Sequence, residues 1–404
     1  MNVKQSFLGS SGTLFFLVIV SAFPPLTTDL YLPALPTMVE MLNTTQTMVN
    51  LTLSVYFVMY ALGLLFWGPL SEKFGRKPIM LLGLVIYVMA SLLCAMANNI
   101  EMLIGARLVQ AFGGSAVTVV ATAIVKDLYT GREREKIMAT IMSLVIIAPM
   151  VAPVLGAFLL KIGSWHMMFY ALAIFGAIST LLTLFYRETL QQRYTGSVLR
   201  SWGRIAVVTK NPRFIVLLVI FTIPPMTLMA FLAAGSYIYI DGFGLSEQMF
   251  SYAFAFNALV ASFGPSIYMK FSRSIAVHKI ITTSFIIMMV LGVLTYTIGH
   301  LSPWLFACLV APATLMMLIT RVPGINLMLD QQSSDTGSAV AVIQFCSMMA
   351  GAIGMTLVSL RPNDLIHNLG IIQFSVGAIV SVLWFMVKKR PFVVDNIPKQ
   401  QDDI

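Results

Sequence analysis

The sequence predicts an all-α integral membrane protein whose twelve transmembrane helices form two six-helix bundles. Charged residues make up 10% of the 404 residues and hydrophobic residues 58%, whereas soluble globular proteins have about 25% and about 45–50%. Apolar runs of about 18–25 residues, the length that crosses roughly 30 Å of hydrocarbon, recur from end to end. The basic residues collect in alternate intervals between these runs, which is typical of a chain that crosses a membrane repeatedly.

The apolar runs define the expected spans. The first run continues past Pro24 and Pro25 to Leu35, which favours an uncleaved first helix over a signal peptide. Short polar or proline-containing segments separate each run from the next. The spans are expected at residues 12–36, 47–70, 79–97, 102–125, 137–160, 166–186, 213–239, 248–269, 280–299, 303–323, 337–360 and 369–387.

The distribution of basic residues predicts the orientation, because Lys and Arg are enriched in cytoplasmic loops. With twelve spans, 22 of the 25 basic residues fall on one side, and only Arg107, Lys161 and Arg361 do not. Arg321 belongs to the larger set, since we place it at the cytoplasmic end of the tenth span. Both termini are therefore expected to be cytoplasmic. The net charge of +9 then reflects contact with anionic lipid head groups, and nucleic-acid binding is not expected.

The longest polar interval divides the chain in two. We expect residues 1–186 to form an N-terminal six-helix bundle, 187–212 a cytoplasmic linker, and 213–404 a C-terminal six-helix bundle with a short cytoplasmic tail. The halves echo each other weakly, since Pro24-Pro25 recurs as Pro224-Pro225. Matched bundles of this kind are typical of transporters that bind substrate between the halves, near the membrane midplane.

Asp29 and Arg107 are ionisable residues inside apolar spans. A charge at the bilayer centre costs roughly 2.5–3.5 kcal/mol on insertion scales, so such residues are typical of ion or substrate pathways. Burial disfavours the charged form of a carboxyl group and a nearby cation favours it, so a change in the surroundings of Asp29 can load and release a proton. A structural role remains the alternative for each. We expect no comparable charge inside the second half.

Aromatic and amide side chains inside the spans are candidates for substrate contact in an apolar cavity with a few polar anchors. For each aromatic residue taken singly, ordinary helix packing is the alternative. The candidates are Tyr31, Tyr56, Tyr60 and Gln110 in the first half, and Tyr237, Phe254, Asn257 and Gln344 in the second.

The segment 68–78, between the second and third spans, carries a recognisable loop. It reads Gly-Pro-Leu-Ser-Glu-Lys-Phe-Gly-Arg-Lys-Pro. Gly68 permits close helix contact, Gly75 allows the tight turn, and Arg76 favours a cytoplasmic location. The loop resembles the signature loop of the major facilitator superfamily. The resemblance implies that Glu72, where the family usually has aspartate, latches the halves against the N-terminus of the eleventh span.

Further motifs make the resemblance more specific. Arg107 with Gln110 resembles the arginine-x-x-glutamine motif of the superfamily. Pro149, Pro153 and Gly156 in the fifth span resemble the helix-kinking proline-glycine motif of its exporting branch. The run Asp29 to Pro36, the loop motif and Lys126-Asp127-Leu128-Tyr129 together resemble the bicyclomycin-resistance subfamily of drug:proton antiporters, which includes the phenicol exporters, and we count Asp127 with the loop as part of a conformational gate.

The resemblance implies proton-coupled multidrug efflux of small amphiphilic compounds, such as phenicol-type antibiotics, by alternating access. It also implies a monomer in a bacterial inner (plasma) membrane, whose partners are the drug, protons and membrane lipid. A proton-coupled transporter of a metabolite such as a sugar or polyamine is the alternative. We expect no enzyme, cofactor or metal site, since no Gly-Lys-Ser/Thr phosphate loop is present and the four histidines lie at predicted span ends or in loops.

Overall fold

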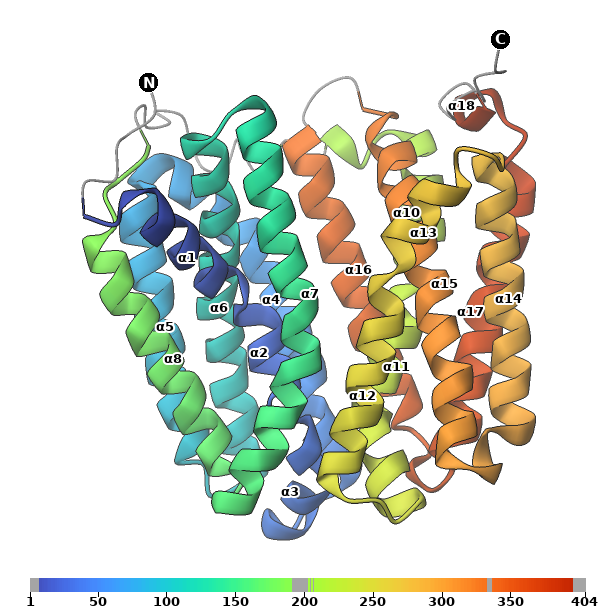
Figure 1. Ribbon diagram of the computed structural model, residues 1–404, viewed down its shortest axis with the longest axis horizontal. Helices are drawn as coiled ribbons and strands as arrows, with labels where there is room; N and C mark the ends of the chain where they lie inside the picture. Colours follow the sequence, from blue (N-terminus) through green and yellow to red (C-terminus); the bar gives the residue numbers. More distant parts are fainter. Residues whose placement is uncertain (1–6, 191–202, 204, 206, 333–335, 395–404) are drawn as a thin grey trace. The chain divides into compact units, whose positions relative to one another are not determined.

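The computed structural model describes residues 7–190, 203, 205, 207–332 and 336–394. These residues form helices joined by short connections, with no strand among them (Figure 1). The chain divides into two compact units, Met1–Trp202 and Gly203–Ile404. The boundary between the units falls inside the polar interval 187–212.

The N-terminal unit begins with a broken span. Pro24 and Pro25 lie at the start of α2 and Pro33 lies in η1, and proline interrupts a helix because it has no N–H to donate. The later helices begin at ordinary caps, since the side chains of Thr45 and Asn99 accept hydrogen bonds from backbone N–H groups of the first turns. The elements are α1 (Gly9–Ser21), α2 (Phe23–Asp29), η1 (Leu32–Ala34), α3 (Leu35–Met41), α4 (Gln46–Phe74), α5 (Arg76–Ala95), α6 (Ile100–Leu128), α7 (Gly131–Ile162) and α8 (His166–Phe185).

The C-terminal unit has a similar break in its first span. Pro224 and Pro225 separate α10 from α11, as the two prolines in α2 follow the end of α1. The elements are α10 (Pro212–Thr222), α11 (Pro225–Tyr237), η2 (Ile238–Gly242), α12 (Glu247–Ser262), α13 (Gly264–Phe271), α14 (Val277–Ile298), η3 (Gly299–Leu301), α15 (Pro303–Leu329), α16 (Thr336–Val358), η4 (Pro362–Asp364), α17 (Leu365–Val387) and α18 (Pro391–Val394).

Eleven helical stretches in the described part of the chain are long and apolar enough to cross a membrane, and each corresponds to an expected span. The fifth expected span, 137–160, lies within α7. Of α7, the stretch Ile147–Ile162 is apolar and shorter than the other eleven. The all-helical, multi-pass character predicted from the sequence is therefore confirmed.

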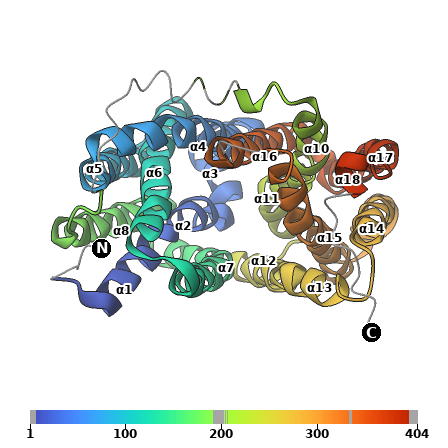
Figure 2. The same cartoon turned by 90° about the horizontal axis from the view of Figure 1, so that it is seen from above.

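Small residues allow the helices of each unit to approach closely. In the N-terminal unit α6 packs between α4 and α5 (Figure 2), and a Cβ on Gly113 would lie 2.7 Å from the carbonyl oxygen of Gly83 in α5. In the C-terminal unit α14 packs on α17, where a Cβ on Gly377 would lie 2.8 Å from the backbone nitrogen of Met289. Close backbone approach through small residues is the usual packing mode of membrane helices.

The tenth span corrects two sequence expectations. We placed its end at residue 323, but α15 continues to Leu329 with Pro323 inside the helix. Pro323 is buried, and a Cβ on Gly324 would lie 2.5 Å from the ring of Phe221, so this part of α15 packs tightly on α10. Arg321 therefore lies inside an apolar helix, eight residues before Leu329, and not at the end of that helix. The expectation of no charge in the second half comparable to Asp29 and Arg107 overlooks Arg321, which lies within a helix long and apolar enough to cross a membrane.

Candidate functional site

Arg107 is the centre of a polar cluster inside the N-terminal unit. Its side chain has no exposed surface. Its Nη1 donates hydrogen bonds to Gln110 Oε1 at 2.7 Å and to the carbonyl oxygen of Thr27 at 3.3 Å, and its Nη2 donates to Tyr31 Oη at 3.2 Å. The guanidinium thus ties α6 to the broken first span.

Aromatic rings cover the guanidinium group on several sides. The Arg107 Cζ lies 4.2 Å from the ring centroid of Tyr56 in α4 and 4.7 Å from that of Tyr31. A cation over an aromatic ring gains about 0.5–1 kcal/mol when exposed and about 2 or more when desolvated. These contacts offset part of the cost of burying the charge, and they fix the guanidinium without a carboxylate partner.

Three more hydrogen bonds extend the cluster. Gln110 Nε2 donates to Ser91 Oγ of α5 at 2.8 Å, and the hydroxyls of Tyr31 and Thr52 are 3.2 Å apart. The ring of Tyr60 stacks on Tyr56, with centroids 5.8 Å apart, and its hydroxyl donates to Thr118 Oγ1 at 2.7 Å. The structure therefore brings Tyr31, Tyr56, Tyr60 and Gln110 together around Arg107.

Asp29 is the last residue of α2 and is 4% exposed. The hydroxyl of Thr28 donates to its Oδ1 at 2.8 Å. In the described part of the chain, the ion pairs within 4.0 Å are Arg76–Asp127 and His367–Asp364, so the carboxylate of Asp29 and the guanidinium of Arg107 are not in direct contact. Arg107 instead binds Thr27 and Tyr31, which lie two residues before and after Asp29.

Helix α7 braces the break in the first span beside Asp29. A Cβ added to Gly156 would lie 1.8 Å from the carbonyl oxygen of Leu30, so no other residue fits without a backbone shift. Pro149 and Pro153 lie within α7, which remains one helix of 32 residues. The proline-glycine motif therefore positions α7 directly against the residue that follows Asp29.

The loop motif forms a network at the end of the N-terminal unit. Arg76 is 7% exposed, and its Nε donates to Asp127 Oδ2 at 2.9 Å while its Nη1 donates to Ser71 Oγ at 2.7 Å. These bonds tie the start of α5 to the ends of α4 and α6. Gly75 has φ +109°, a conformation that favours glycine. Gly68 and Glu72, the latter exposed, line a hollow next to Arg76.

The sequence reasoning missed Glu188, which completes this network. Its Oε1 accepts hydrogen bonds from the backbone N–H groups of Arg76, Thr189 and Leu190 at 3.1, 2.9 and 2.9 Å. Its Oε2 accepts from the N–H of Lys77 at 3.0 Å. A carboxylate at a helix N-terminus satisfies free N–H groups and complements the helix dipole. The available signal was an acidic residue directly after a span, at the start of a basic interval.

The predicted second-half residues lie at two places. Tyr237, Phe254 and Asn257 are buried in α11 and α12, and the ring of Phe254 stacks on Phe231 with centroids 5.9 Å apart. Gln344 of α16 lies elsewhere in the unit, lining a pocket beside Arg321. Its Oε1 accepts a hydrogen bond of 3.4 Å from Arg321 Nη2.

The sequence model of the Major Facilitator Superfamily matches residues 14–355, and the chain belongs to this superfamily of transporters. It is 30% identical to the uncharacterized MFS-type transporter YdgK of Bacillus subtilis over 93% of this chain and 95% of that protein. It is 27% identical to a bicyclomycin resistance protein homolog of Haemophilus influenzae, over 90% and 86% of the two chains. It is 33% identical to a chloramphenicol resistance protein of Pseudomonas aeruginosa, over 58% and 56%.

Solved structures share the fold at low sequence identity. A mutant of the nucleoside transporter NupG superposes with a TM-score of 0.75 at 13% identity, covering 93% of this chain and 99% of that one. A D-xylose-proton symporter superposes with a TM-score of 0.68 at 15% identity, covering 94% and 98%. These similarities show the major facilitator fold, as the loop motif predicted.

Proposed function

We propose that this protein is a drug:proton antiporter that exports small amphiphilic compounds by alternating access. The names of its relatives, which include bicyclomycin and chloramphenicol resistance proteins, support a drug as the exported substrate. The observation that carries the proposal is the placement of Asp29. Its buried carboxyl group ends α2 between the two residues through which Arg107 holds the first span.

The coupling follows from the geometry of this broken span. With an effective dielectric constant of about 20, two opposite unit charges attract by about 4 kcal/mol at 4 Å and by about 2 kcal/mol at 8 Å. A shift of α2 against α6 therefore changes the free energy of the ionised Asp29 carboxyl by an amount large enough to bind or release a proton. Arg107 can supply this bias while it remains fixed by Gln110 and Tyr56.

The finer architecture belongs to the same proposal. Twelve spans, with α7 as the fifth, put both termini on the same side of the membrane, and the basic residues of the loops make that side the cytoplasm. Residues 187–212 then link two six-helix bundles. The protein works as a monomer in the inner membrane. Glu72, exposed in the hollow that Arg76 also lines, contributes the latch that the loop motif implies, with the Glu188 network holding the loop in shape.

The proposal is tested by proton-driven transport in inside-out vesicles. An acidic lumen should drive accumulation of chloramphenicol by the wild type, whereas Asp29→Asn should abolish accumulation because the amide keeps the shape and cannot titrate. Exchange of labelled for unlabelled drug without a gradient should persist in Asp29→Asn. The matched control is Glu40→Gln, which neutralises an exposed acid of the same span and should transport normally. Undiminished accumulation by Asp29→Asn would show that the proton is carried elsewhere.

A further inference from the structure

Arg321 is a charge within a membrane-spanning helix that the proposed coupling mechanism does not use. It lies in α15, eight residues before Leu329 and therefore about 12 Å from that end of the helix. A charge at such a depth is costly, and charged residues inside spans usually face a cavity or a partner. The Arg321 side chain is exposed, and it lines a pocket within the C-terminal unit.

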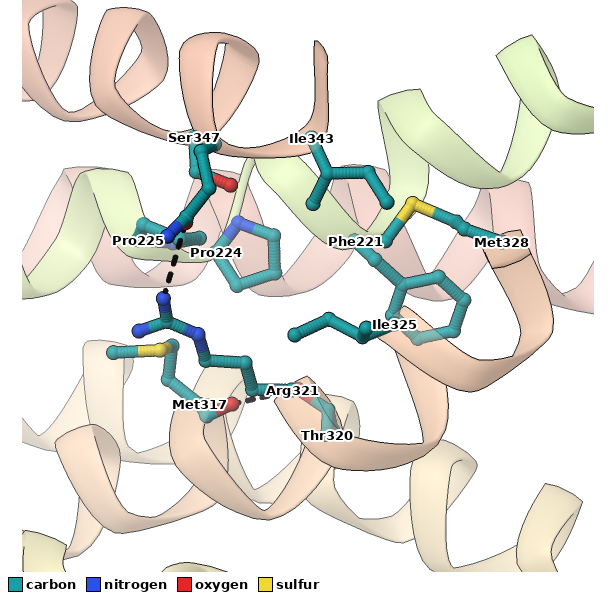
Figure 3. A pocket seen from close by; sticks show the side chains of 11 residues that line it. Phe221, Pro224, Pro225, Met317, Thr320, Arg321, Ile325, Met328, Ile343 and Ser347 are labelled. Carbon is teal, nitrogen blue, oxygen red and sulfur yellow. Dashed lines mark hydrogen bonds between the residues drawn. The ribbon is translucent and has the colours of Figure 1, made fainter. Parts of the chain in front are cut away.

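The pocket combines an apolar wall with very few polar groups. Figure 3 shows the guanidinium of Arg321 in a space bounded by side chains of α10, α11, α15 and α16. None of the described residues that line this pocket is acidic. The lining residues are Phe221, Pro224, Pro225, Met317, Thr320, Arg321, Ile325, Met328, Ile343, Gln344 and Ser347.

The positive charge of Arg321 is poorly compensated. Its single side-chain hydrogen bond among the described residues is the one of 3.4 Å to Gln344 Oε1, and none of the ion pairs there includes it. A guanidinium has five N–H donors in a planar fork that matches a carboxylate with two parallel bonds. Arg107, in contrast, is fully enclosed and has three hydrogen-bond partners. Arg321 therefore has donors available for a ligand.

We propose that Arg321 and Gln344 form a subsite for the carboxylate of an amphiphilic monoanion, whose apolar body lies against Phe221, Ile325 and Met328. This inference rests on the proposed function, because the ligand would be a transported compound. The space between the lining side chains is narrow, about 360 Å³ including the part that is open to solvent. Ligand binding therefore requires side chains to turn, and Met317 and Met328 are flexible enough to do so.

The test measures binding to the purified full-length protein in detergent, where no gradient is needed. The probes are dansylglycine, a fluorescent monoanion at pH 7, and its neutral amide, which differs only at the carboxyl group. The wild type should bind the anion about tenfold more tightly than the amide. Arg321→Gln should remove this preference, and Arg321→Lys should keep part of it because the charge remains and the planar fork is lost.

The matched control is Arg361→Gln, which removes an exposed arginine of the same unit outside the pocket and should retain the full preference. Size-exclusion profiles establish that each variant is folded, and the comparison with Arg321→Lys holds even if Arg321→Gln is unstable. Equal binding of the two probes by the wild type, or an unchanged preference in folded Arg321→Gln, would overturn the subsite. Such a result leaves chloramphenicol export intact, whereas failure of the proposed function would appear as absent proton-driven export with the anion preference still present.

Discussion

Removal of the Glu188 carboxylate should destabilise the N-terminal unit more than removal of other acids near helix ends. Four backbone N–H groups donate to this side chain, two of them from the first residues of α5. A hydrogen bond to a charged group contributes about 1.5–3 kcal/mol. Because Glu188 is half-buried, we take the low end for the two bonds to Arg76 and Lys77, which gives about 3 kcal/mol for Glu188→Ala.

The expected change is measurable as a shift in the thermal unfolding midpoint of the purified protein. For units of about 200 residues, 1 kcal/mol shifts Tm by about 2–4 °C, so Glu188→Ala should lower Tm by roughly 6–12 °C. Glu188→Gln should lower it by about half as much. Its amide oxygen can replace Oε1, which accepts three of the bonds, while its NH₂ group faces the N–H of Lys77.

The control for this experiment is Glu101→Ala. Glu101 is an exposed acid in the first turn of α6, where the helix dipole alone contributes about 0.3–1 kcal/mol. We expect a Tm change of no more than about 2–4 °C for this variant. If Glu188→Ala and Glu101→Ala lower Tm equally, the hydrogen bonds of Glu188 do not hold α5 in place and the reasoning fails.

Two further predictions concern the bracing helix and the topology. Gly156→Ala should lower the free energy of unfolding by more than about 3 kcal/mol and reduce both Tm and export, because the added Cβ would lie 1.8 Å from the Leu30 carbonyl oxygen. Gly105→Ala is the control and should leave stability unchanged, because a Cβ there meets nothing within 4 Å. Equal thermal stability of the two variants would contradict this account. In a background without the three native cysteines, a cysteine at Asn363 should react with an impermeant thiol reagent from outside the cell and one at Arg273 should not, and the reverse pattern would refute the orientation.

The spans could be predicted because hydrocarbon thickness imposes one length on every apolar segment. The error at α15 also has a physical cause. In a soluble protein a proline followed by a glycine usually marks the end of a helix. In a membrane protein a helix can continue through a proline where neighbouring helices pack around it, as α15 does at Pro323. The same error placed Arg321 at the end of the tenth span, although it lies eight residues before the end of α15.

Only those contacts of the candidate site that lie within a single helix could be predicted from the sequence. Arg107 and Gln110 are three residues apart, so their contact follows from helical spacing alone. Tyr31 and Tyr56 reach Arg107 from other spans, and their contact depends on how the break after α2 orients the chain. Glu188 binds backbone N–H groups more than 100 residues away, and backbone donors leave no mark in the sequence.

The two arginines inside apolar helices, Arg107 and Arg321, differ in burial and in hydrogen bonding, and this difference suits them to different roles. Arg107 is fully buried, has three hydrogen-bond partners, and is covered by the rings of Tyr31 and Tyr56, so a ligand could reach the guanidinium only by displacing these contacts. Arg321 has one long bond and faces a pocket, so a ligand gains bonds without displacing strong ones. Because binding energy depends on the difference between bonds formed and bonds lost, the enclosed arginine suits a fixed electrostatic reference for Asp29 and the open arginine suits recognition.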